Sequence, residues 1–223
     1  APLMPVKHSV DLTKETPENE KTIHAEYAAE MARMLVYDIF REETYTRGLN
    51  VYTTIRDKDQ IAAWEAVRKH LIAYDRKYRY RGPSGRIDIS DEQTRDDTIR
   101  LALHKAKSSD NLEPAVVTEL TDKTFKAVVL DGKELKTLDL DADSRKFAGK
   151  YLTNKVAKEK RLQPGSIIRV SRVKKGWTLS QIPEVQAGFI SVNFDTGAVK
   201  SLVGGFDFYL NMFNHVTQAL RQP

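Results

Sequence analysis

The stretch AVVTELTDKTFKAVVLDGKELKTLDL, residues 115–140, decides the fold of this chain. Its two apolar runs, Ala115 to Leu120 and Phe125 to Leu130, are rich in residues that favour strands. Thr121-Asp122 predicts a turn between them, and Asp131-Gly132 is a strong signal for a two-residue hairpin. A third strand is expected over residues 134–140, where leucines partly alternate with polar side chains. The stretch therefore predicts three consecutive strands joined by short turns.

The residues that follow complete a small barrel pattern. Ser144 to about Glu159 predicts a helix, with one apolar stripe formed by Phe147, Tyr151, Leu152 and Val156. Pro164-Gly165 ends this helix, and two further strands are expected over Ile167 to Val173 and Trp177 to Ile182. Three strands, a helix and two strands is the order of the five-stranded OB barrel. We therefore predict an α+β protein with an OB-like barrel over residues 114–183.

The segment before the barrel is predicted to be mainly helical. Residues 1–21, rich in Pro, Lys, Glu and Thr, are expected to be a flexible arm. Residues 22–83 are expected to form a helical linker, with helices over Ile23–Arg41 and Asp57 to about Tyr78 and a short strand over residues 51–55. Asp57 and Gln60 have the spacing of a capping box at the start of the second helix. The apolar stripes expected in the core are Tyr27, Met31, Met34 and Leu35 on the first helix and Ile61, Trp64, Val67, Leu71 and Tyr74 on the second.

Two more segments flank the predicted barrel. Residues 84–113 are expected to be a polar helical insertion, whose short helix carries Ile99, Leu101 and Leu103 and is capped by Ser90 and Gln93. After the barrel, Phe189 to Phe194 predicts a strand and Asp195-Thr196-Gly197 a turn. A second apolar run over Ala198 to Val203 ends at Gly204-Gly205, which we interpret as a strand end and not as a phosphate-binding loop.

The composition bounds the chemistry of the chain. Its 223 residues are 40% hydrophobic, which is enough for a core, and contain no cysteine. A disulfide framework, a thiolate metal site and a cysteine nucleophile are therefore excluded. No apolar run approaches the roughly 18 residues of a membrane span. The net charge of +5 suits several anionic partners and selects none of them.

No metal or cofactor site is expected from the sequence. The five histidines, His8, His24, His70, His104 and His215, do not have the spacing of a ligand set. The acidic pairs Asp96-Asp97 and Glu42-Glu43 have the pattern of exposed helix charge and not that of a general acid and base.

A dimeric aspartic protease is one alternative function. Asp195-Thr196-Gly197-Ala198 reproduces the D-T-G-A core of that enzyme class. The chemistry needs two carboxylates that share one proton, and the chain has no second such motif, so only a dimer could supply it. A tight turn, with Asp195 bonded to its own backbone and Gly197 at positive φ, explains the same residues.

A nucleic-acid-binding module is the second alternative, because OB folds bind single strands through basic grooves and aromatic platforms. The basic residues considered for such a groove are Lys155, Lys158, Lys160, Arg161, Arg169, Arg172, Lys174 and Lys175. Among the strands only Phe125 and Trp177 are aromatic, and Phe147 and Tyr151 are expected in the core. This scarcity of platforms makes nucleic acid an unexpected partner.

The C-terminal segment resembles the start of the transpeptidase domain of class A penicillin-binding proteins. The family pattern is an apolar strand, a T-G turn, L-V-G-G-x-D-F and then F-N-x-x-T-Q-A-x-R-Q-P, which residues 188–223 follow. G-L-x-V-Y-T-T-I at residues 48–55 is similar to the family's inter-domain linker, and Trp177 to Pro183 to the end of its OB-like insertion. Two positions depart from the pattern: Asn193-Phe194, where an acidic residue and Pro are usual, and His215, where Arg is usual.

The resemblance implies a fragment of a bifunctional peptidoglycan synthase that polymerises glycan strands and cross-links their peptides. Residues 184–223 would be the first strands of a truncated transpeptidase domain, and the catalytic serine would lie just beyond Pro223. We accordingly expect no catalytic, cofactor-binding or metal-binding residue in this chain. The expected partners are an outer-membrane lipoprotein activator or other cell-wall synthesis proteins, with peptidoglycan as a further candidate. The implied location is the periplasmic face of the bacterial inner membrane, reached through an N-terminal anchor that this chain lacks.

Overall fold

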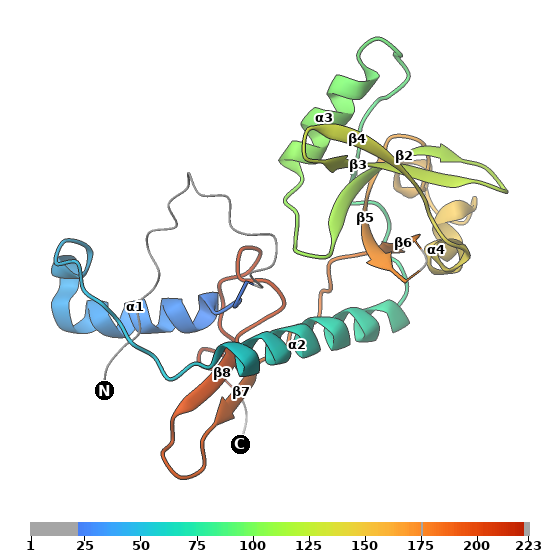
Figure 1. Ribbon diagram of the computed structural model, residues 1–223. Helices are drawn as coiled ribbons and strands as arrows, with labels where there is room; N and C mark the ends of the chain where they lie inside the picture. Colours follow the sequence, from blue (N-terminus) through green and yellow to red (C-terminus); the bar gives the residue numbers. More distant parts are fainter. Residues whose placement is uncertain (1–21, 175, 221–223) are drawn as a thin grey trace. The chain divides into compact units, whose positions relative to one another are not determined.

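The computed structural model describes residues 22–174 and 176–220, and it divides the chain into two compact units (Figure 1). Residues 72–184 form one unit, which we call the inserted unit. The residues before 72 and after 184 form the other, which we call the host unit. The host unit is therefore discontinuous in sequence, and the chain enters the inserted unit once and leaves it once. The predicted arm over residues 1–21 lies outside the described residues.

The inserted unit contains the predicted OB-like barrel. Its strands are β2 (Glu113–Leu120), β3 (Phe125–Asp131), β4 (Glu134–Asp139), β5 (Ser166–Val173) and β6 (Gly176–Ser180). β2 pairs antiparallel with β3 and β5, β3 pairs with β4, and β5 pairs with β6. A parallel bridge between Leu140 and Trp177 links the remaining two strand ends. The α+β class and the OB-like architecture are confirmed.

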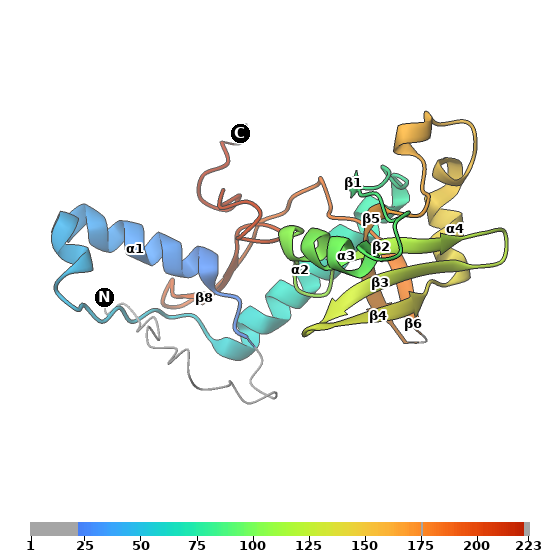
Figure 2. The same ribbon diagram turned by 90° about the horizontal axis from the view of Figure 1, so that it is seen from above.

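Strand β2 is buried on both of its faces. Ala115 and Val117 point into the barrel core with Ile168 and Val170, whereas Val116 belongs to a second cluster with Ile99 and Leu103. This second cluster lies under α3 (Arg95–Lys105), which packs on β2 and β3 (Figures 1 and 2). Burial on both faces explains why β2 is a continuous apolar run and not an alternating one.

The segment predicted as a polar insertion is joined to the barrel sheet. β1 (Gly85–Arg86) pairs antiparallel with β5, and α3 covers the sheet. The predicted caps are wrong, because Ser90 bonds to Asp88 and α3 begins only after Thr94, whose side chain makes no capping bond. Leu101 is 57% exposed, so the buried stripe of this helix is Ile99 and Leu103 without it.

The helix between β4 and β5 is shorter than predicted. α4 spans Ala142–Ala148, and Gly149, at φ +51, ends it. Two 3-10 turns, Gly149–Leu152 and Lys158–Lys160, replace the predicted helix as far as Glu159. Glycine reaches positive φ at low cost, so this single residue can end a helix that the apolar stripe predicts to continue.

The host unit contains α1 (Glu26–Phe40), the 3-10 helix Arg41–Tyr45, the first part of α2 (Asp57–Lys77) and the hairpin β7 (Phe189–Val192) and β8 (Val199–Val203). The strand predicted over residues 51–55 is wrong, since only Val51 makes a bridge there. The Thr54 hydroxyl donates to the Val199 carbonyl and the Arg56 N–H to the Lys200 carbonyl. These contacts align the segment with β8 without forming a strand ladder.

The buried face of α1 differs from the predicted stripe. Tyr27 is buried, but Met34 and Leu35 are 48% and 52% exposed, and the inner line of the helix is Ala28, Ala32 and Val36. Tyr27 packs in a cluster with Leu202, and its hydroxyl donates to the Asn211 carbonyl at 2.6 Å. No helix among the described residues is long and apolar enough to cross a membrane.

Gly204 and Gly205 form a close-packed seat for Tyr27. A Cβ on Gly204 would lie 2.5 Å from Tyr27 Cδ1, and a Cβ on Gly205 would lie 2.5 Å from Tyr27 Oη. Both distances are too short for non-bonded atoms, so only glycine allows the ring to approach this backbone. The two glycines follow β8 directly, as the interpretation as a strand end required.

The predicted capping box is wrong, because the Gln60 side chain has other partners. Its side chain is fully buried, and its Oε1 accepts from the Leu202 N–H at 2.8 Å. Its Nε2 donates to the carbonyls of Leu202, at 3.0 Å, and His24, at 2.8 Å. One amide side chain therefore satisfies both backbone groups of a residue in β8.

Candidate ligand groove on the inserted unit

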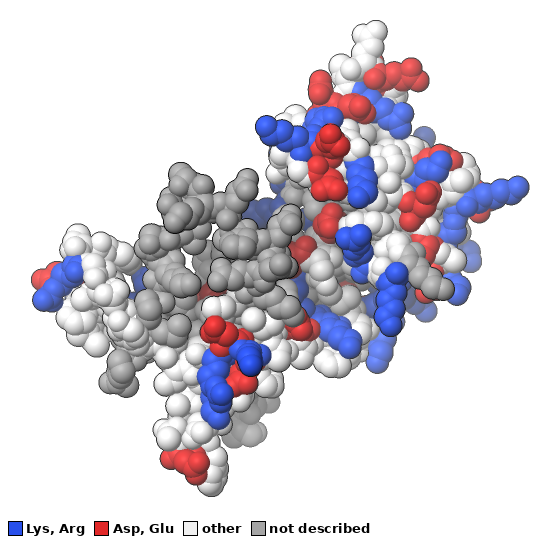
Figure 3. Space-filling view, in the orientation of Figure 1, with Lys and Arg blue, Asp and Glu red and all other residues white. Residues whose placement is uncertain are grey.

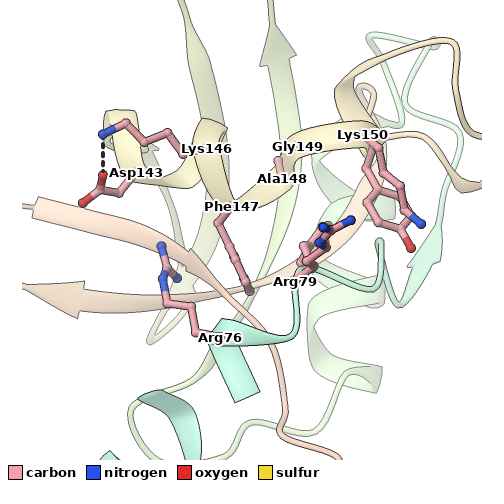
Figure 4. A pocket seen from close by; sticks show the side chains of 10 residues that line it. Arg76, Arg79, Asp143, Lys146, Phe147, Ala148, Gly149 and Lys150 are labelled. Carbon is pink, nitrogen blue, oxygen red and sulfur yellow. Dashed lines mark hydrogen bonds and ion pairs between the residues drawn. The ribbon is translucent and has the colours of Figure 1, made fainter. Parts of the chain in front are cut away.

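A cationic groove is the strongest candidate site in the inserted unit (Figure 4). It encloses about 500 Å³ between the end of α2 and the segment formed by α4 and the 3-10 turn after it. Its lining residues are Arg76, Arg79, Tyr80, Asp143, Lys146, Phe147, Ala148, Gly149, Lys150 and Tyr151.

Four basic side chains and one acidic side chain line this groove. Lys146 pairs with Asp143 at 3.2 Å, and both side chains are largely exposed. An exposed pair of this kind contributes little stability and can exchange partners readily. The basic groups that remain without an acidic counterpart in the lining are Arg76, Arg79 and Lys150, so the groove suits an anion.

Arg76 is held in place by its surroundings. Its Nη1 donates to the Leu179 carbonyl at 2.7 Å, and its guanidinium carbon lies 4.2 Å from the centre of the Phe147 ring. Burial lowers the pKa of Arg76, and the charges of Asp141 and Asp143 oppose that shift. Arginine stays protonated throughout the physiological range, so this side chain is a fixed cation with unused donors.

Arg79 has a backbone conformation that is unusual for a side chain of its size. Its φ is +79°, in the region that favours glycine, and such a residue costs roughly 1–3 kcal/mol. Gln181 fixes this turn, because its Nε2 donates to the Arg79 carbonyl at 3.2 Å and its Oε1 accepts from the Arg81 N–H at 3.0 Å. Figure 4 shows the Arg76 and Arg79 side chains extending from the end of α2 toward the α4 segment.

Tyr80 contributes a buried hydroxyl that has no partner in the part of the chain that the structure describes. The residue is 3% exposed, and its ring packs edge-on against Tyr151 and tilted against Phe147. Burial, followed by the charge of Tyr151, raises the pKa of Tyr80 far above its usual value. The hydroxyl is therefore a neutral donor at every physiological pH.

A buried carboxylate fixes the end of α2, next to the groove. Asp75 is 3% exposed and accepts from Arg81 Nη1 at 2.9 Å and from Gln181 Nε2 at 2.7 Å. It also accepts from the Glu184 N–H at 3.2 Å. One side chain thus joins the end of α2, where the chain enters the inserted unit, to the residue where the chain leaves it.

The D-T-G motif has no catalytic geometry among the described residues. Asp195 is exposed on the turn between β7 and β8. The predicted turn is present, with Gly197 at φ +68, but the side chain that closes it is Asn193 and not Asp195. Asn193 Oδ1 accepts from the N–H groups of Asp195, at 3.1 Å, and Thr196, at 2.9 Å.

The residues considered for nucleic-acid binding do not form stacking platforms. Phe125 and Tyr151 are buried, and Phe147 and Trp177 pack against the barrel core. Two of the basic residues, Arg161 and Arg169, donate to backbone carbonyls, and Lys175 lies outside the described residues. On the face drawn in Figure 3, acidic and basic side chains are interspersed over the inserted unit.

The histidines have separate structural surroundings. His24 stacks on Trp64 with ring centres 3.6 Å apart, and the buried His215 Nε2 has no hydrogen-bond partner in the part of the chain that the structure describes. His8 is outside the described residues. Within those residues no group of three or more His, Cys, Asp or Glu side chains could hold a metal ion.

The groove was not predicted from the sequence. Phe147 and Tyr151 were expected in the core and do pack there, but no local pattern relates them to Arg76, Arg79 or Lys150. The available signal was the run Arg-Lys-Tyr-Arg-Tyr-Arg over residues 76–81, where cations and aromatics alternate at the end of a helix. Its partner segment lies about 70 residues further on, and only the folded chain brings the two together.

The architecture of the inserted unit agrees with a known sequence family. Residues 80–185 match the family described as "Penicillin-binding protein OB-like domain". "Penicillin-binding protein 1A" of Neisseria lactamica is 39% identical over 197 residues, which are 88% of this chain and 24% of the relative. The chain belongs to the class A penicillin-binding proteins. It spans about a quarter of the length of the curated relatives that it matches.

Two further class A penicillin-binding proteins are similar to this chain. "Penicillin-binding protein 1A" of Pseudomonas aeruginosa is 39% identical over 217 residues, or 94% of this chain and 25% of the relative. The crystal structure of Penicillin-Binding Protein 1A from Haemophilus influenzae matches with a TM-score of 0.73 at 26% identity. That match covers 94% of this chain and 29% of the other, so it includes elements of both units.

The motifs through which the chain resembles class A penicillin-binding proteins converge in the host unit. Ile55, from the linker motif, packs in the same cluster as Leu202 and Phe208, from the C-terminal motif. At the two departures from the family pattern, Asn193 closes the β7–β8 turn and the His215 N–H donates to the Gly204 carbonyl at 2.8 Å. Both residues therefore have local structural roles.

Proposed function

We propose that this chain is a non-catalytic scaffold and docking part of a peptidoglycan synthase. The whole protein polymerises glycan strands from lipid-linked disaccharide and cross-links their stem peptides through an acyl-enzyme. Membership of the class A penicillin-binding proteins supports this proposal, together with relatives whose printed name is Penicillin-binding protein 1A.

Both catalytic centres belong, in this proposal, to parts of the protein outside the 223 residues. The nucleophile of cross-linking is the serine of an S-x-x-K motif beyond Pro223. The protein works on the periplasmic face of the inner membrane and is anchored by a segment N-terminal to this chain.

The inserted unit is the docking element in this proposal. The observation that carries it is the cationic groove between α2 and α4, with three basic side chains in excess over acidic ones. Its occupant is either a protein regulator, such as an outer-membrane lipoprotein activator, or the cell-wall polymer itself.

Labelling with a fluorescent penicillin tests the enzyme assignment. This chain should not be acylated, whereas a version extended beyond Pro223 to the end of its transpeptidase domain should be acylated at one serine. Substituting alanine for that serine should abolish the label. An extended, folded protein that stays unlabelled would refute the proposed function.

A further inference from the structure

We propose that the groove between α2 and α4 binds the carboxylates of peptidoglycan stem peptides. This inference rests on the proposed function and names the ligand class of its docking element. The groove lies within the inserted unit, residues 72–184. It would retain the polymer, or a growing strand, beside the enzyme.

The charge of the groove is suited to carboxylates. Arg79 and Lys150 have no acidic partner among the described residues, and Arg76 has donors left after its bond to the Leu179 carbonyl. Guanidinium groups bind carboxylates through paired N–H donors, and charged hydrogen bonds of this kind are about twice as strong as neutral ones. Repeating stem peptides present such carboxylates at regular intervals along a glycan strand.

The size of the groove favours a small fragment over a protein surface. A volume of about 500 Å³ lies within the roughly 300–1,000 Å³ of small-molecule sites. A stable protein partner would need about 800 Å² of surface on each side. The groove has a volume suited to part of one stem peptide, whose carboxylate ends its basic side chains would contact.

Two features of the groove support a binding role independently of its net charge. Arg79 keeps a strained positive φ that Gln181 stabilises, and this turn places its side chain at the groove. Tyr80, which also lines the groove, is 3% exposed, and its hydroxyl has no hydrogen-bond partner among the described residues. Strain and unpaired polar groups of this kind cluster at binding sites, because the surrounding structure retains them against a cost in stability.

Calorimetric titration of the 223-residue chain with muropeptides tests the inference. The probe is the disaccharide-peptide fragment released from cell walls by a muramidase, and its matched control is the same fragment with every carboxyl converted to an amide. We expect saturable binding of the acidic fragment that weakens with added salt, and at least about tenfold weaker binding of the amide.

Variants locate the site. Arg79→Gln with Lys150→Gln should weaken binding by roughly tenfold or more. Arg79→Lys keeps the charge but loses the paired donors, so it should weaken binding less. The matched control is Lys123→Gln with Lys133→Gln, which removes two exposed lysines from turns of the barrel outside the groove and should leave binding unchanged. Circular dichroism establishes that each variant is folded.

Several outcomes would overturn the inference. These are equal binding of acidic and amidated fragments, no binding at millimolar concentration, or equal losses in the groove and control variants. Binding to an acidic peptide or to vesicles of anionic phospholipid, with none to muropeptides, would assign the groove to another partner. If the extended protein is labelled by penicillin and any of these results is obtained, the proposed enzyme assignment survives and only the ligand assignment fails.

Discussion

Asp141 shows how one side chain organises the start of a helix. It precedes α4, and its Oδ1 accepts from the Ser144 N–H at 2.8 Å, the Ser144 hydroxyl at 2.7 Å and the Thr178 hydroxyl at 2.9 Å. Burial by itself would raise the pKa of Asp141. The bonds from Ser144 and Thr178 and the charge of Arg76 outweigh burial, so the pKa lies below its usual value.

This lowered pKa predicts acid sensitivity of the inserted unit. In the unfolded chain the group titrates near pH 4, so its contribution to stability is fully present above that pH. The contribution is lost as the pH falls through the lower pKa of the folded state. Asp141→Asn keeps an oxygen acceptor but removes the charge, and hydrogen bonds to a charged acceptor are the stronger ones. It should therefore reduce the free energy of unfolding by about 1 kcal/mol at pH 7 and by less at pH 3. Urea unfolding at the two pH values measures the difference.

Asp143→Asn is the matched control for that experiment. Asp143 lies in the same helix, but its side chain is exposed and forms an ion pair with the exposed Lys146. It should change stability by a few tenths of a kcal/mol at either pH. Equal pH dependence of the two variants would contradict the role of Asp141.

At the scale of elements, α2 uses polar side chains on its buried face. Gln60, Arg68 and Asp75 are all under 4% exposed. In the host unit Gln60 bonds to Leu202, and Arg68 donates to the Phe206 carbonyl at 2.9 Å. In the inserted unit Asp75 bonds to the Glu184 N–H. The helix therefore satisfies backbone groups of the segments that follow the barrel.

Replacement of Gln60 should destabilise the host unit. Gln60→Leu leaves the Leu202 N–H and carbonyl buried without their side-chain partner, and each unsatisfied group costs about 1–3 kcal/mol. We expect a total loss of about 2–4 kcal/mol in denaturant unfolding. Lys69→Leu, at an exposed position of the same helix, should change stability by less than about 0.5 kcal/mol. Similar losses in both variants would mean that the amide bridge contributes nothing.

The strands and the long helices could be predicted because their signals are local. Turn residues separated the barrel strands. The predicted hairpin is present, but its two loop residues are Gly132 and Lys133, with Asp131 opposite Glu134, one residue later than the Asp131-Gly132 signal. Gln60 was misinterpreted because its partner in β8 is 142 residues away, whereas the capping-box spacing is visible within four residues. The strand at residues 51–55 was overpredicted because β-branched residues also suit an extended segment that bonds through a side chain.

The candidate groove could be predicted only in part. Its aromatic residues have a helical spacing that predicts core packing, and the structure places them there. Its cations come from the end of α2 and from α4 with its 3-10 turn, and no local pattern relates these segments. The positive φ of Arg79 was also invisible, because side-chain bonds from Gln181 hold a conformation that arginine does not favour.

For the whole molecule, the two-unit organisation predicts that residues 72–184 fold alone. The barrel has its own core, and Asp75 ties the first turns of the segment to Glu184 at its end. The isolated segment should unfold cooperatively and give a dispersed amide NMR spectrum that overlays the corresponding signals of the full chain.

Asp75→Ala tests whether the bond between the two ends of this segment stabilises its fold. It removes a buried carboxylate and leaves the Arg81 guanidinium and the Gln181 amide without that acceptor. We expect a loss of about 2–3 kcal/mol in the free energy of unfolding. An isolated segment that is unfolded, or an Asp75→Ala variant of unchanged stability, would show that the unit depends on the host for its fold.

The closed neck at Asp75 also bears on how such a protein can change over time. Because the Asp75 carboxylate accepts from the Glu184 N–H, the end of α2 and the residue where the chain leaves the inserted unit lie close together, and residues 72–184 form a loop with joined ends. The entropic cost of closing a loop grows only slowly with its length, so insertions of different lengths at this position differ little in that cost. Recombination at this neck could exchange one barrel for another while leaving the Tyr27 seat and the Gln60 bridge of the host intact. The ligand binding proposed for the barrel could thus be inherited separately from the framework that carries it.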